Sequence, residues 1–452
     1  MKFGNRTWSM KKWVLALPLG LAMLPIAAQA IDLTPVGAER SASADALIPP
    51  WTGGEISPPV GWRPGQARVN PWAHEPMLFS INSANVDQYA TRLSPGQAQL
   101  LHSLKGYRMD VFPSKRSCGY PDQFYQRTKA ATGVAKLGSD GWTLMDGYAA
   151  AVPFPIPRSG AEVIWNHKLR YQGQGLSWSY YTVVPPKNGG IGEPMSSDEL
   201  ILLPMADPKT GDLKGAKGVE ALFVNVATAP AQVAGDAVLA HAFVDKPNDI
   251  WLYFAGQRRV RRAPTYGHDA PILNLENLMN VDAFLMFNGP MDRYDFKLLG
   301  KREMIVPYNW IALANPADKL TDVVQPSYLN RDLARYEHHR VWVVEATVKP
   351  GLRHVFPKRT FFVDEDTWGI VVEDLYDAQG KLQRVMESGP FVAHEIGSCV
   401  WQATVSHDLV AGRYVADRLP MGKTPSDWAA GRDGRVKASS FEPDALRRSN
   451  VR

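Results

Sequence analysis

The sequence predicts a mainly β fold with antiparallel strands and a few helices. The main observation is the stretch 359–382, RTFFVDEDTWGIVVEDLYDAQGKL, in which two apolar runs are each followed by a polar turn. Val, Ile, Phe, Tyr and Trp between Asp and Gly clusters are typical of an antiparallel meander. A second observation is the hairpin predicted for residues 339–348 and 353–363, through the turn Lys349-Pro350-Gly351-Leu352.

The N-terminus has the pattern of an export signal. Four basic residues precede an apolar run at 13–28, and Ala28-Gln29-Ala30 has the small-x-small pattern of a cleavage site. We therefore expect residues 1–30 to be a signal peptide, cleaved near Ala30, and the rest of the chain to be periplasmic. No cysteine follows the cleavage site, so lipidation is not expected. Peripheral contact with the outer membrane is a further expectation.

Charge and cysteine content narrow the function classes. The chain has 50 basic and 45 acidic residues, but four basic ones and no acidic one lie in the first 30, so the remainder carries +1. This near-neutral balance gives no indication of a nucleic-acid partner. Cys118 and Cys399 are the only cysteines. In an exported chain they predict a disulfide, and two separate buried thiols are the alternative.

Local sequence patterns predict the structure of the two ends of the chain and of its first helices. Residues 31–84 are predicted to form an extended arm, because their Pro-Pro and Gly-Gly pairs exclude a helix or a central strand. Residues 85–105 predict one or two helices, the clearer of which begins after the N-cap Ser94, with Pro95 in its first turn. One domain is predicted for 85–420, followed by a flexible tail at 421–452 that is rich in Gly, Ser and charge.

Further strands are predicted from about residue 141 onward. They are 162–173, 176–184, 219–226, 250–254, a strand from 260 onward, 391–405 and 414–419. Both faces of 250–254 are apolar, so this strand is expected to be covered on both sides. Residues 272–287 interrupt the strand pattern and predict a helix or an apolar flap.

Five acids lie within residues 364–374 of the opening stretch, and they allow two interpretations. Asp364, Glu365 and Asp366 are consecutive at the end of a predicted strand, where turn chemistry favours such residues on the surface. The alternative is a metal or acid/base site, although the spacing is not that of a calcium loop. A two-residue turn would place His354 opposite Thr347, too far from His339 for a shared metal. We therefore predict no metal site and no cofactor.

The arginine run is the third candidate site. Arg258, Arg259, Arg261 and Arg262 are favoured as an exposed strand edge or hairpin end, and contact with anionic lipid headgroups is the alternative. No nucleophile elbow, phosphate-binding loop or dinucleotide-binding motif is present in the sequence. No catalytic residue is therefore predicted.

Four stretches carry a family resemblance. They are 33–40 with 48–54, then 85–116, 340–347 and 359–382. On these stretches the chain resembles exported proteobacterial proteins of unknown function that are labelled outer-membrane lipoprotein-sorting-like. Cys118 departs from the family pattern, which has a small residue without a thiol there. The resemblance implies an incomplete antiparallel β-barrel like that of the carriers LolA and LolB, with helices over its concave face. It also implies an RND-type exporter and an outer-membrane β-barrel protein as partners, and no catalytic residues.

The expected function is that of a periplasmic carrier that shields a lipid or another hydrophobic molecule in an apolar cavity. Eight aromatic residues are the predicted cavity lining, two of them in a candidate lid at 278–287. They are Trp251, Tyr253, Trp342, Phe361, Phe362 and Trp368, with Phe284 and Phe287 in the lid. One alternative is a periplasmic hydrolase that uses the carboxylates at 364–366. The other is a scaffold for outer-membrane assembly that transports nothing.

Overall fold

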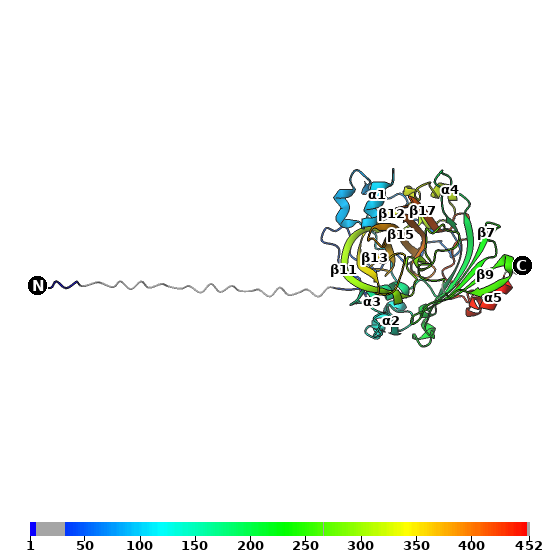
Figure 1. The fold of residues 1–452 in the computed structure, drawn as a ribbon, viewed down its shortest axis with the longest axis horizontal. Coiled ribbons are helices and arrows are strands. Elements are labelled where there is room, and N and C mark those ends of the chain that lie inside the picture. The colour runs from blue at the N-terminus through cyan, green and yellow to red at the C-terminus, as the bar shows by residue number, and fades with distance from the viewer. Residues whose placement is uncertain (6–31, 265, 450–452) are drawn as a thin grey trace. The chain divides into compact units, whose positions relative to one another are not determined.

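Strands dominate the structure (Figure 1), a computed structural model that describes residues 1–5, 32–264 and 266–449. In chain order they are β1 (Phe79–Ile81), β2 (Met109–Val111), β3 (Lys136–Leu137), β4 (Leu144–Asp146), β5 (Gly175–Val183), β6 (Met195–Leu202), β7 (Val219–Ala229), β8 (Ala237–Phe243), β9 (Asp249–Phe254), β10 (Arg259–Arg262), β11 (Tyr294–Pro307), β12 (Arg335–Val348), β13 (Lys358–Asp364), β14 (Ile370–Tyr376), β15 (Leu382–Ala393), β16 (Ser398–Asp408) and β17 (Arg413–Leu419).

Nearly all of these strands belong to one sheet. The 15-stranded sheet has the order β1-β2-β12-β13-β14-β15-β16-β17-β5-β6-β7-β8-β9-β10, and β11 pairs with β12 beside this path. Within the described residues the end strands β1 and β10 do not pair with each other, so the curved sheet stays open (Figure 1). The predicted mainly β fold with an unclosed antiparallel sheet is confirmed.

Helices are few and short. The α-helices are α1 (Pro95–Ser103), α2 (Asp122–Ala131), α3 (Gly160–Lys168), α4 (Leu320–Val323) and α5 (Pro443–Ser449). The 3-10 helices are η1 (Val86–Arg92), η2 (Pro204–Ala206), η3 (Pro208–Thr210), η4 (Ala255–Gln257), η5 (Val281–Ala283), η6 (Met291–Arg293), η7 (Ala312–Ala314), η8 (Arg331–Leu333) and η9 (Ala438–Phe441). Among the described helices, none has both the length and the apolar character needed to span a bilayer.

The longer helices cover both faces of the sheet. Phe361 and Phe362 are neighbours on β13 and therefore point to opposite faces. Helix α3 packs against Val344, which pairs with Phe361 across β12 and β13. Helix α1 contacts Asp374, which lies on the face of Phe362. Helices were expected over the concave face; the sheet has apolar side chains on both faces, and helices cover each of them.

The sequence predicted the meander and helix α1 at their observed places. β12 to β17 follow one another as antiparallel neighbours, and Ser94 caps α1 in a capping box with Gln97. The hairpin between β12 and β13 has a longer connection than expected, because Thr347 pairs with Lys358. His354 therefore lies in the connecting loop and does not face Thr347.

Two segments differ from the prediction, and a third decides between its two alternatives. Residues 160–168 form α3 and not a strand, because Ser159 caps the segment by accepting a hydrogen bond from the Glu162 backbone N–H. Residues 272–287 are mostly irregular, with only η5 helical, since non-glycine residues such as Leu285 and Met286 adopt positive φ there, which excludes the predicted helix and leaves the alternative of an apolar flap. Residues 421–449 were expected to be flexible, yet Trp428 is 0% exposed.

The arm is packed against the body of the unit to which it belongs. Val36 and Ile48 of the arm are buried, and Arg116 donates hydrogen bonds to the backbone oxygens of Glu39 and Pro49. Apart from residues 1–5, the predicted signal peptide and its cleavage site lie outside the described residues. Leu33–Arg452 form one compact unit.

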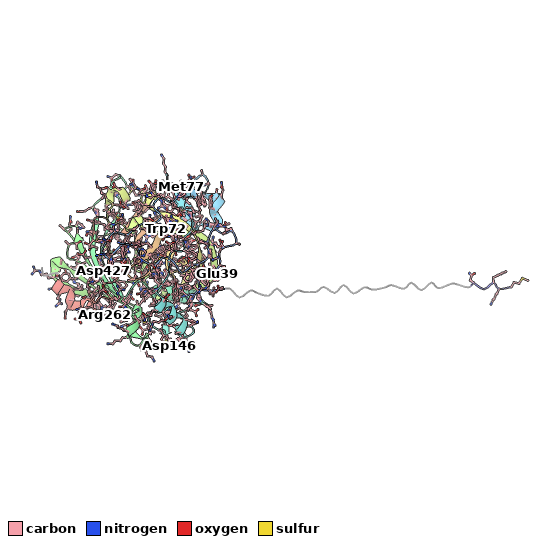
Figure 2. The ribbon with its side chains drawn as sticks, turned by 180° about the vertical axis from the view of Figure 1, so that it is seen from behind. Glu39, Trp72, Met77, Asp146, Arg262 and Asp427 are labelled. Carbon is pink, nitrogen blue, oxygen red and sulfur yellow. A yellow bond between two sulfur atoms is a disulfide. The ribbon has the colours of Figure 1, made fainter. Side chains whose placement is uncertain are left out.

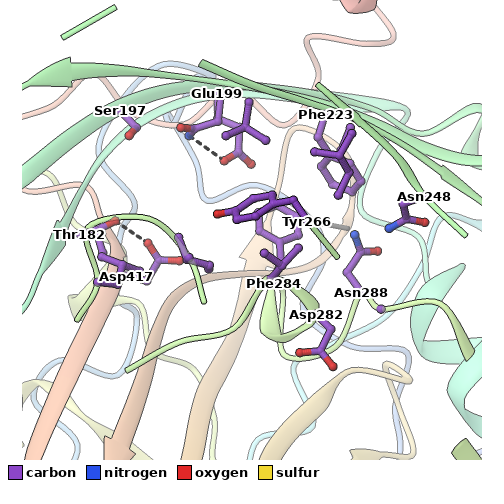
Figure 3. Close-up of a pocket in the computed structure, with 18 of the residues that line it drawn as sticks. Thr182, Ser197, Glu199, Phe223, Asn248, Tyr266, Asp282, Phe284, Asn288 and Asp417 are labelled. Atoms are coloured by element: carbon purple, nitrogen blue, oxygen red, sulfur yellow. Dashed lines mark hydrogen bonds between the residues drawn. The ribbon is translucent and has the colours of Figure 1, made fainter. Parts of the chain in front are cut away.

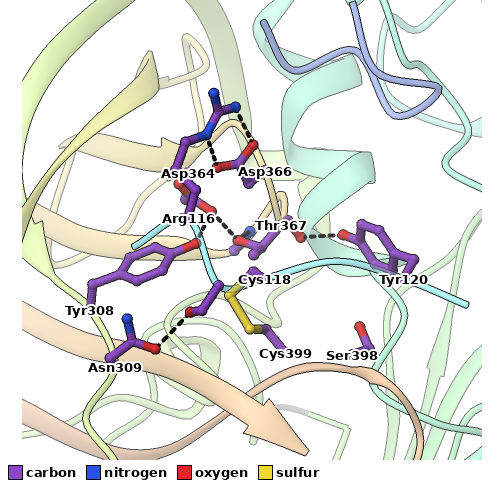
Figure 4. The surroundings of a disulfide bond; sticks show 12 residues. Arg116, Cys118, Tyr120, Tyr308, Asn309, Asp364, Asp366, Thr367, Ser398 and Cys399 are labelled. Carbon is purple, nitrogen blue, oxygen red and sulfur yellow. Dashed lines mark hydrogen bonds and ion pairs between the residues drawn. A yellow bond between two sulfur atoms is a disulfide. The ribbon is translucent and has the colours of Figure 1, made fainter. Parts of the chain in front are cut away.

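The two cysteines form a disulfide (Figure 4). Cys118, in the segment before α2, is joined to Cys399 of β16 across 281 residues of sequence. Both residues are buried in a cluster with Phe362 and Val372. The bond therefore ties the N-terminal part of the chain to the middle of the large sheet.

Candidate functional site

An apolar cavity of about 160 Å³ lies between strands β5 to β9 and the 266–290 segment (Figure 3). The sheet contributes side chains from five adjacent strands and from β17. These are Tyr180 and Thr182, Met195, Ser197 and Glu199, Phe223 and Asn225, Val238 and Ala240, Ile250, and Asp417 with Arg418. The opposite wall is irregular chain that includes Tyr266, Ile272, Leu275, Val281, Phe284 and Pro290.

Strand alternation selects which sheet residues reach the cavity. On β6 the residues that reach the cavity are every second one, namely Met195, Ser197 and Glu199. Glu199 pairs with Asn225 of the neighbouring strand β7. Phe223 pairs with Ala240, and Ala240 pairs with Ile250, so the same face continues to β9. The sheet wall is therefore one continuous face of an antiparallel sheet.

The other face of these strands is covered by the C-terminal segment. Trp251 and Tyr253 alternate with Ile250 and lie on this outer face, where Tyr253 packs in a cluster with Phe441 and Leu446. This explains why both faces of β9 are apolar, as the sequence indicated. Trp251 and Tyr253 do not line this cavity, because they lie on the face of β9 that the C-terminal segment covers.

The 266–290 segment is held in place at its centre by buried polar contacts. Asp282 accepts hydrogen bonds from Arg359, and its Oδ2 lies 3.0 Å from His354 Nε2. Asn280, two residues before Asp282, accepts a hydrogen bond from Arg384 through its side-chain oxygen at 2.8 Å. These arginines come from β13 and β15, so the meander fixes the irregular wall of the cavity.

A polar group lies at the β5–β17 end of the cavity. The Tyr180 hydroxyl donates to Glu199 Oε2 at 2.7 Å, and Asn225 donates to the same oxygen at 3.2 Å. Arg418 lies 3.6 Å from that oxygen and pairs with Asp417. Burial raises the pKa of Glu199 above its ordinary value, against the lowering effect of Arg418.

A local irregularity in β17 brings two neighbouring residues into the cavity. The pairing of β17 with β5 shifts register between Ala416 and Leu419, and Arg418 has a φ of 60°. A bulge interrupts the alternation of a strand and redirects side chains, so both Asp417 and Arg418 line the cavity. Backbone strain of this kind at a non-glycine residue persists only where the surroundings enforce it.

Of the eight aromatic residues predicted to line a cavity, Phe284 is the one found in this wall. It packs edge-to-face on Phe223 with ring centroids 4.9 Å apart. The others are packed elsewhere: Phe287 and Phe361 against each other, Trp342 against Trp368, and Phe362 beside the disulfide, in addition to the pair on β9. Alternation along a strand does not indicate which face a ligand reaches, so aromatic content alone could not identify the residues of this wall.

The site residues that sequence reasoning missed are Tyr180, Glu199, Asn225, Asp417 and Arg418. A signal existed in residues 195–202, MSSDELIL, where an acid is followed by an apolar run. An acid in the inward register of a buried strand is unusual, because an ionised carboxylate is costly to bury without partners. Its partners come from segments far apart in sequence, so the pattern could not identify the cluster.

The acidic turn is buried, which corrects the surface interpretation. Asp364, Glu365 and Asp366 are at most 3% exposed. Arg116 donates to both oxygens of Asp366, at 2.7 and 2.9 Å, and Lys301 donates to Glu365 at 2.7 Å (Figure 4). These cations come from segments that are distant in sequence. The sequence therefore could not show that the acidic turn is buried together with its positively charged partners.

The same turn contains a donor set that the sequence spacing did not predict. His339, Asp364 and Asp366 each offer one ligand atom, and these atoms lie within 4.8 Å of one another. One imidazole and two carboxylates suit a divalent cation. Arg116 already binds both oxygens of Asp366, however, and none of the three residues lines the apolar cavity.

The burial of Asp374 can be tested by measuring how the stability of the protein depends on pH. It accepts hydrogen bonds from the Ser94 hydroxyl and the Gly96 backbone N–H, both at 3.0 Å, and burial raises its pKa to about 7. A carboxyl with a raised pKa holds its proton more tightly in the folded state, so its ionisation lowers stability as the pH rises from about 4 to about 7. We expect Asp374→Asn to gain up to about 1.4 kcal/mol per pH unit relative to the native protein over this window.

Urea unfolding at pH 5, 6 and 7 measures this difference. The asparagine side chain introduced by D374N can still accept the Gly96 N–H through its oxygen, but its amide group replaces the acceptor of the Ser94 hydroxyl. This loss shifts the stability equally at all three pH values and leaves the predicted pH dependence unchanged. The exposed Asp146, changed to asparagine, is the control and should run parallel to the native protein. Parallel stability curves for the native protein and D374N would contradict the prediction.

The arginine run occupies the edge of the sheet. Arg259, Arg261 and Arg262 are exposed on the end strand β10, and Arg258 is exposed just before it. Arg262 pairs with Asp249 of β9 and lies at the surface (Figure 2). Charged side chains on an edge strand discourage pairing with other chains. Contact with anionic headgroups stays a prediction.

Comparisons with known proteins give the family. A family model described as "Protein of unknown function (DUF1329)" matches residues 80–447. The uncharacterized protein PA3922 of Pseudomonas aeruginosa is 38% identical over 451 residues, which cover 97% of this chain and 98% of that protein. The resemblance seen in the four sequence stretches is thereby confirmed.

Solved structures are similar at low identity. A putative outer membrane lipoprotein-sorting protein domain from Vibrio parahaemolyticus is 15% identical, with 64% of this chain and 98% of that chain covered and a TM-score of 0.43. A DUF1329 family protein from Desulfovibrio piger is 16% identical, with 61% and 92% covered and a TM-score of 0.38. The LolA superfamily protein NE2245 from Nitrosomonas europaea is 12% identical, with 64% and 100% covered and a TM-score of 0.38. On the family match and the close relative, this chain belongs to the DUF1329 family.

Proposed function

We propose that this protein binds a hydrophobic molecule in the cavity between β5–β9 and the 266–290 segment and shields it from water in the periplasm. The observation that carries the proposal is the cavity itself, an apolar space between a continuous sheet face and a wall anchored by buried ion pairs. The export pattern at residues 1–30 and the disulfide support the periplasmic location.

The mechanism is burial and involves no bond-making. Each methylene that leaves water contributes about 0.8 kcal/mol, so six buried methylenes contribute about 5 kcal/mol. The cavity volume of about 160 Å³ is below the ~300–1,000 Å³ of pockets that enclose a drug-sized ligand. The cavity would therefore hold one section of an elongated ligand, with the remainder along its opening. Transfer of the ligand to an RND-type exporter or an outer-membrane β-barrel protein stays a prediction.

The proposal is tested with a neutral fluorescent probe such as N-phenyl-1-naphthylamine. Ala240 lines the cavity from β8, and a tryptophan there would fill part of it. We expect Ala240→Trp to weaken probe binding at least about ten-fold, since the displaced section of ligand loses its apolar contacts. The matched control is Ala234→Trp in the turn before β8, outside the cavity wall, which should bind the probe as the native protein does.

Thermal unfolding of both variants shows whether A240W remains folded. Mass spectrometry of lipids extracted from the protein, purified from its native envelope, gives an independent readout. A native protein that binds no neutral probe and yields no hydrophobic ligand would overturn the proposal. Equal probe binding by folded A240W and the native protein would overturn the assignment to this cavity.

A further inference from the structure

Glu199 is a buried carboxylate whose two oxygens differ in their hydrogen bonding. Its Oε2 accepts from Tyr180 and Asn225, whereas Oε1 has no hydrogen-bond partner among the described residues. The side chain is 3% exposed and lines the cavity. In Figure 3 it points from the sheet into the space that Tyr266 and Phe284 border.

An unpaired buried acceptor is unfavourable unless a partner arrives. Leaving such a group unsatisfied costs about 1–3 kcal/mol, and more when it is charged. Two neighbouring donors are already engaged: the Tyr180 hydroxyl is the donor to Glu199 Oε2, and the Thr182 hydroxyl donates to Asp417 at 2.6 Å. A donor group on a molecule in the cavity would supply the missing hydrogen bond.

The charge around this oxygen disfavours an anion. Glu199 and Asp417 face a single cation, Arg418. Arg418 Nε also lacks a hydrogen-bond partner, but its guanidinium lies 4.1 Å from the centroid of the Phe284 ring and 5.4 Å from that of Trp178. Aromatic faces stabilise a cation, so Arg418 is compensated by Asp417 and by these rings.

We propose that the cavity selects amphiphiles whose head group donates hydrogen bonds, as an amine or a hydroxyl does, and that Glu199 Oε1 receives that hydrogen bond. This inference rests on the proposed function and specifies its ligand class. The apolar part of the molecule lies against Phe223, Ala240 and Ile250, and the head group lies at the β5–β17 end. A carboxylate or phosphate head at the same place would face Glu199 and Asp417 and be repelled.

The test compares three molecules with the same twelve-carbon chain: dodecylamine, dodecanol and dodecanoate. Each displaces N-phenyl-1-naphthylamine from the native protein at pH 7.5. We expect the amine and the alcohol to bind at least about ten-fold more tightly than dodecanoate, which is the effect of one hydrogen bond to a charged group. This comparison needs no variant, so a folding defect cannot obscure it.

Glu199→Gln then assigns the preference to the residue. The variant should lose most of the preference for the amine over dodecanoate. The control is Glu193→Gln, the same change at an exposed position before β6. Equal binding of all three molecules by the native protein, or an unchanged preference in E199Q, would overturn this inference and leave the carrier proposal standing. Failure of every molecule and of the neutral probe would overturn the proposed function as well.

Discussion

Replacing Arg359 with methionine will lower the free energy of unfolding by about 3–5 kcal/mol, the usual cost of removing one partner from a buried ion pair. Arg359 is 0% exposed and joins two acids, because its Nε donates to Glu373 Oε1 at 2.5 Å and its Nη1 donates to Asp282. Methionine fills much of the space but leaves both carboxylates buried without their cation.

The pKa values of these acids show the same dependence. Burial alone would raise the pKa of Asp282, but the Arg359 cation and His354 hold it well below its ordinary value. For Glu373 burial outweighs the effect of Arg359 and raises the pKa to about 7. Without Arg359 the pKa values of both carboxyls would rise, so R359M should recover part of its stability as the pH falls and the carboxyls take up protons.

Urea unfolding followed by circular dichroism measures the effect. Arg359→Lys keeps the charge but loses the second contact, and it should fall between the native protein and R359M. Arg259→Met on the exposed edge is the matched control and should change stability by no more than about 0.5 kcal/mol. If R359M and R259M are equally stable, the buried cation is not what holds the 266–290 segment.

The second large effect is expected from the disulfide. The Cys118→Ala and Cys399→Ala double variant should lose on the order of 5 kcal/mol, because the bond closes a loop of 281 residues and the loss of unfolded-state entropy grows with loop length. Cys118 is 0% exposed and Cys399 is 2% exposed, so alanine also leaves small gaps in their cluster. The alternative of two separate thiols, which the sequence left open, predicts a much smaller loss.

Reduction provides the control for this prediction. Urea unfolding with excess dithiothreitol should bring the native protein close to the double variant, whereas the double variant itself should not respond to the reductant. A native protein whose unfolding is insensitive to reductant, and whose stability equals that of the double variant, would show that the cross-link contributes nothing.

The sequence predicted those parts of the fold whose signals are local. The run Phe361-Phe362-Val363, followed by an acidic turn, specifies a strand and its end, and Ser94 with Pro95 specifies the start of α1. Helix α3 was missed because Val163, Ile164 and Trp165 favour a strand, whereas the Ser159 cap and buried surroundings favour a helix.

The candidate site was less predictable for a physical reason. A ligand reaches only one face of a strand, and which face is decided by segments far away in sequence. Ile250 and Trp251 are both apolar, but the 266–290 segment covers one and the C-terminal segment covers the other. The anchors of that wall, Arg359 and Arg384, likewise lie 77 and 104 residues from the side chains that they hold.

The pairing of β17 with β5 has a consequence for how the chain is made. Thr182 and Asp417, which meet at the polar end of the cavity, are 235 residues apart. During synthesis from the N-terminus, β5 keeps an unpaired edge until β17 has been made. Contacts of such long sequence separation form late in folding. Ligand binding at the proposed cavity would therefore require that the chain has been made as far as β17.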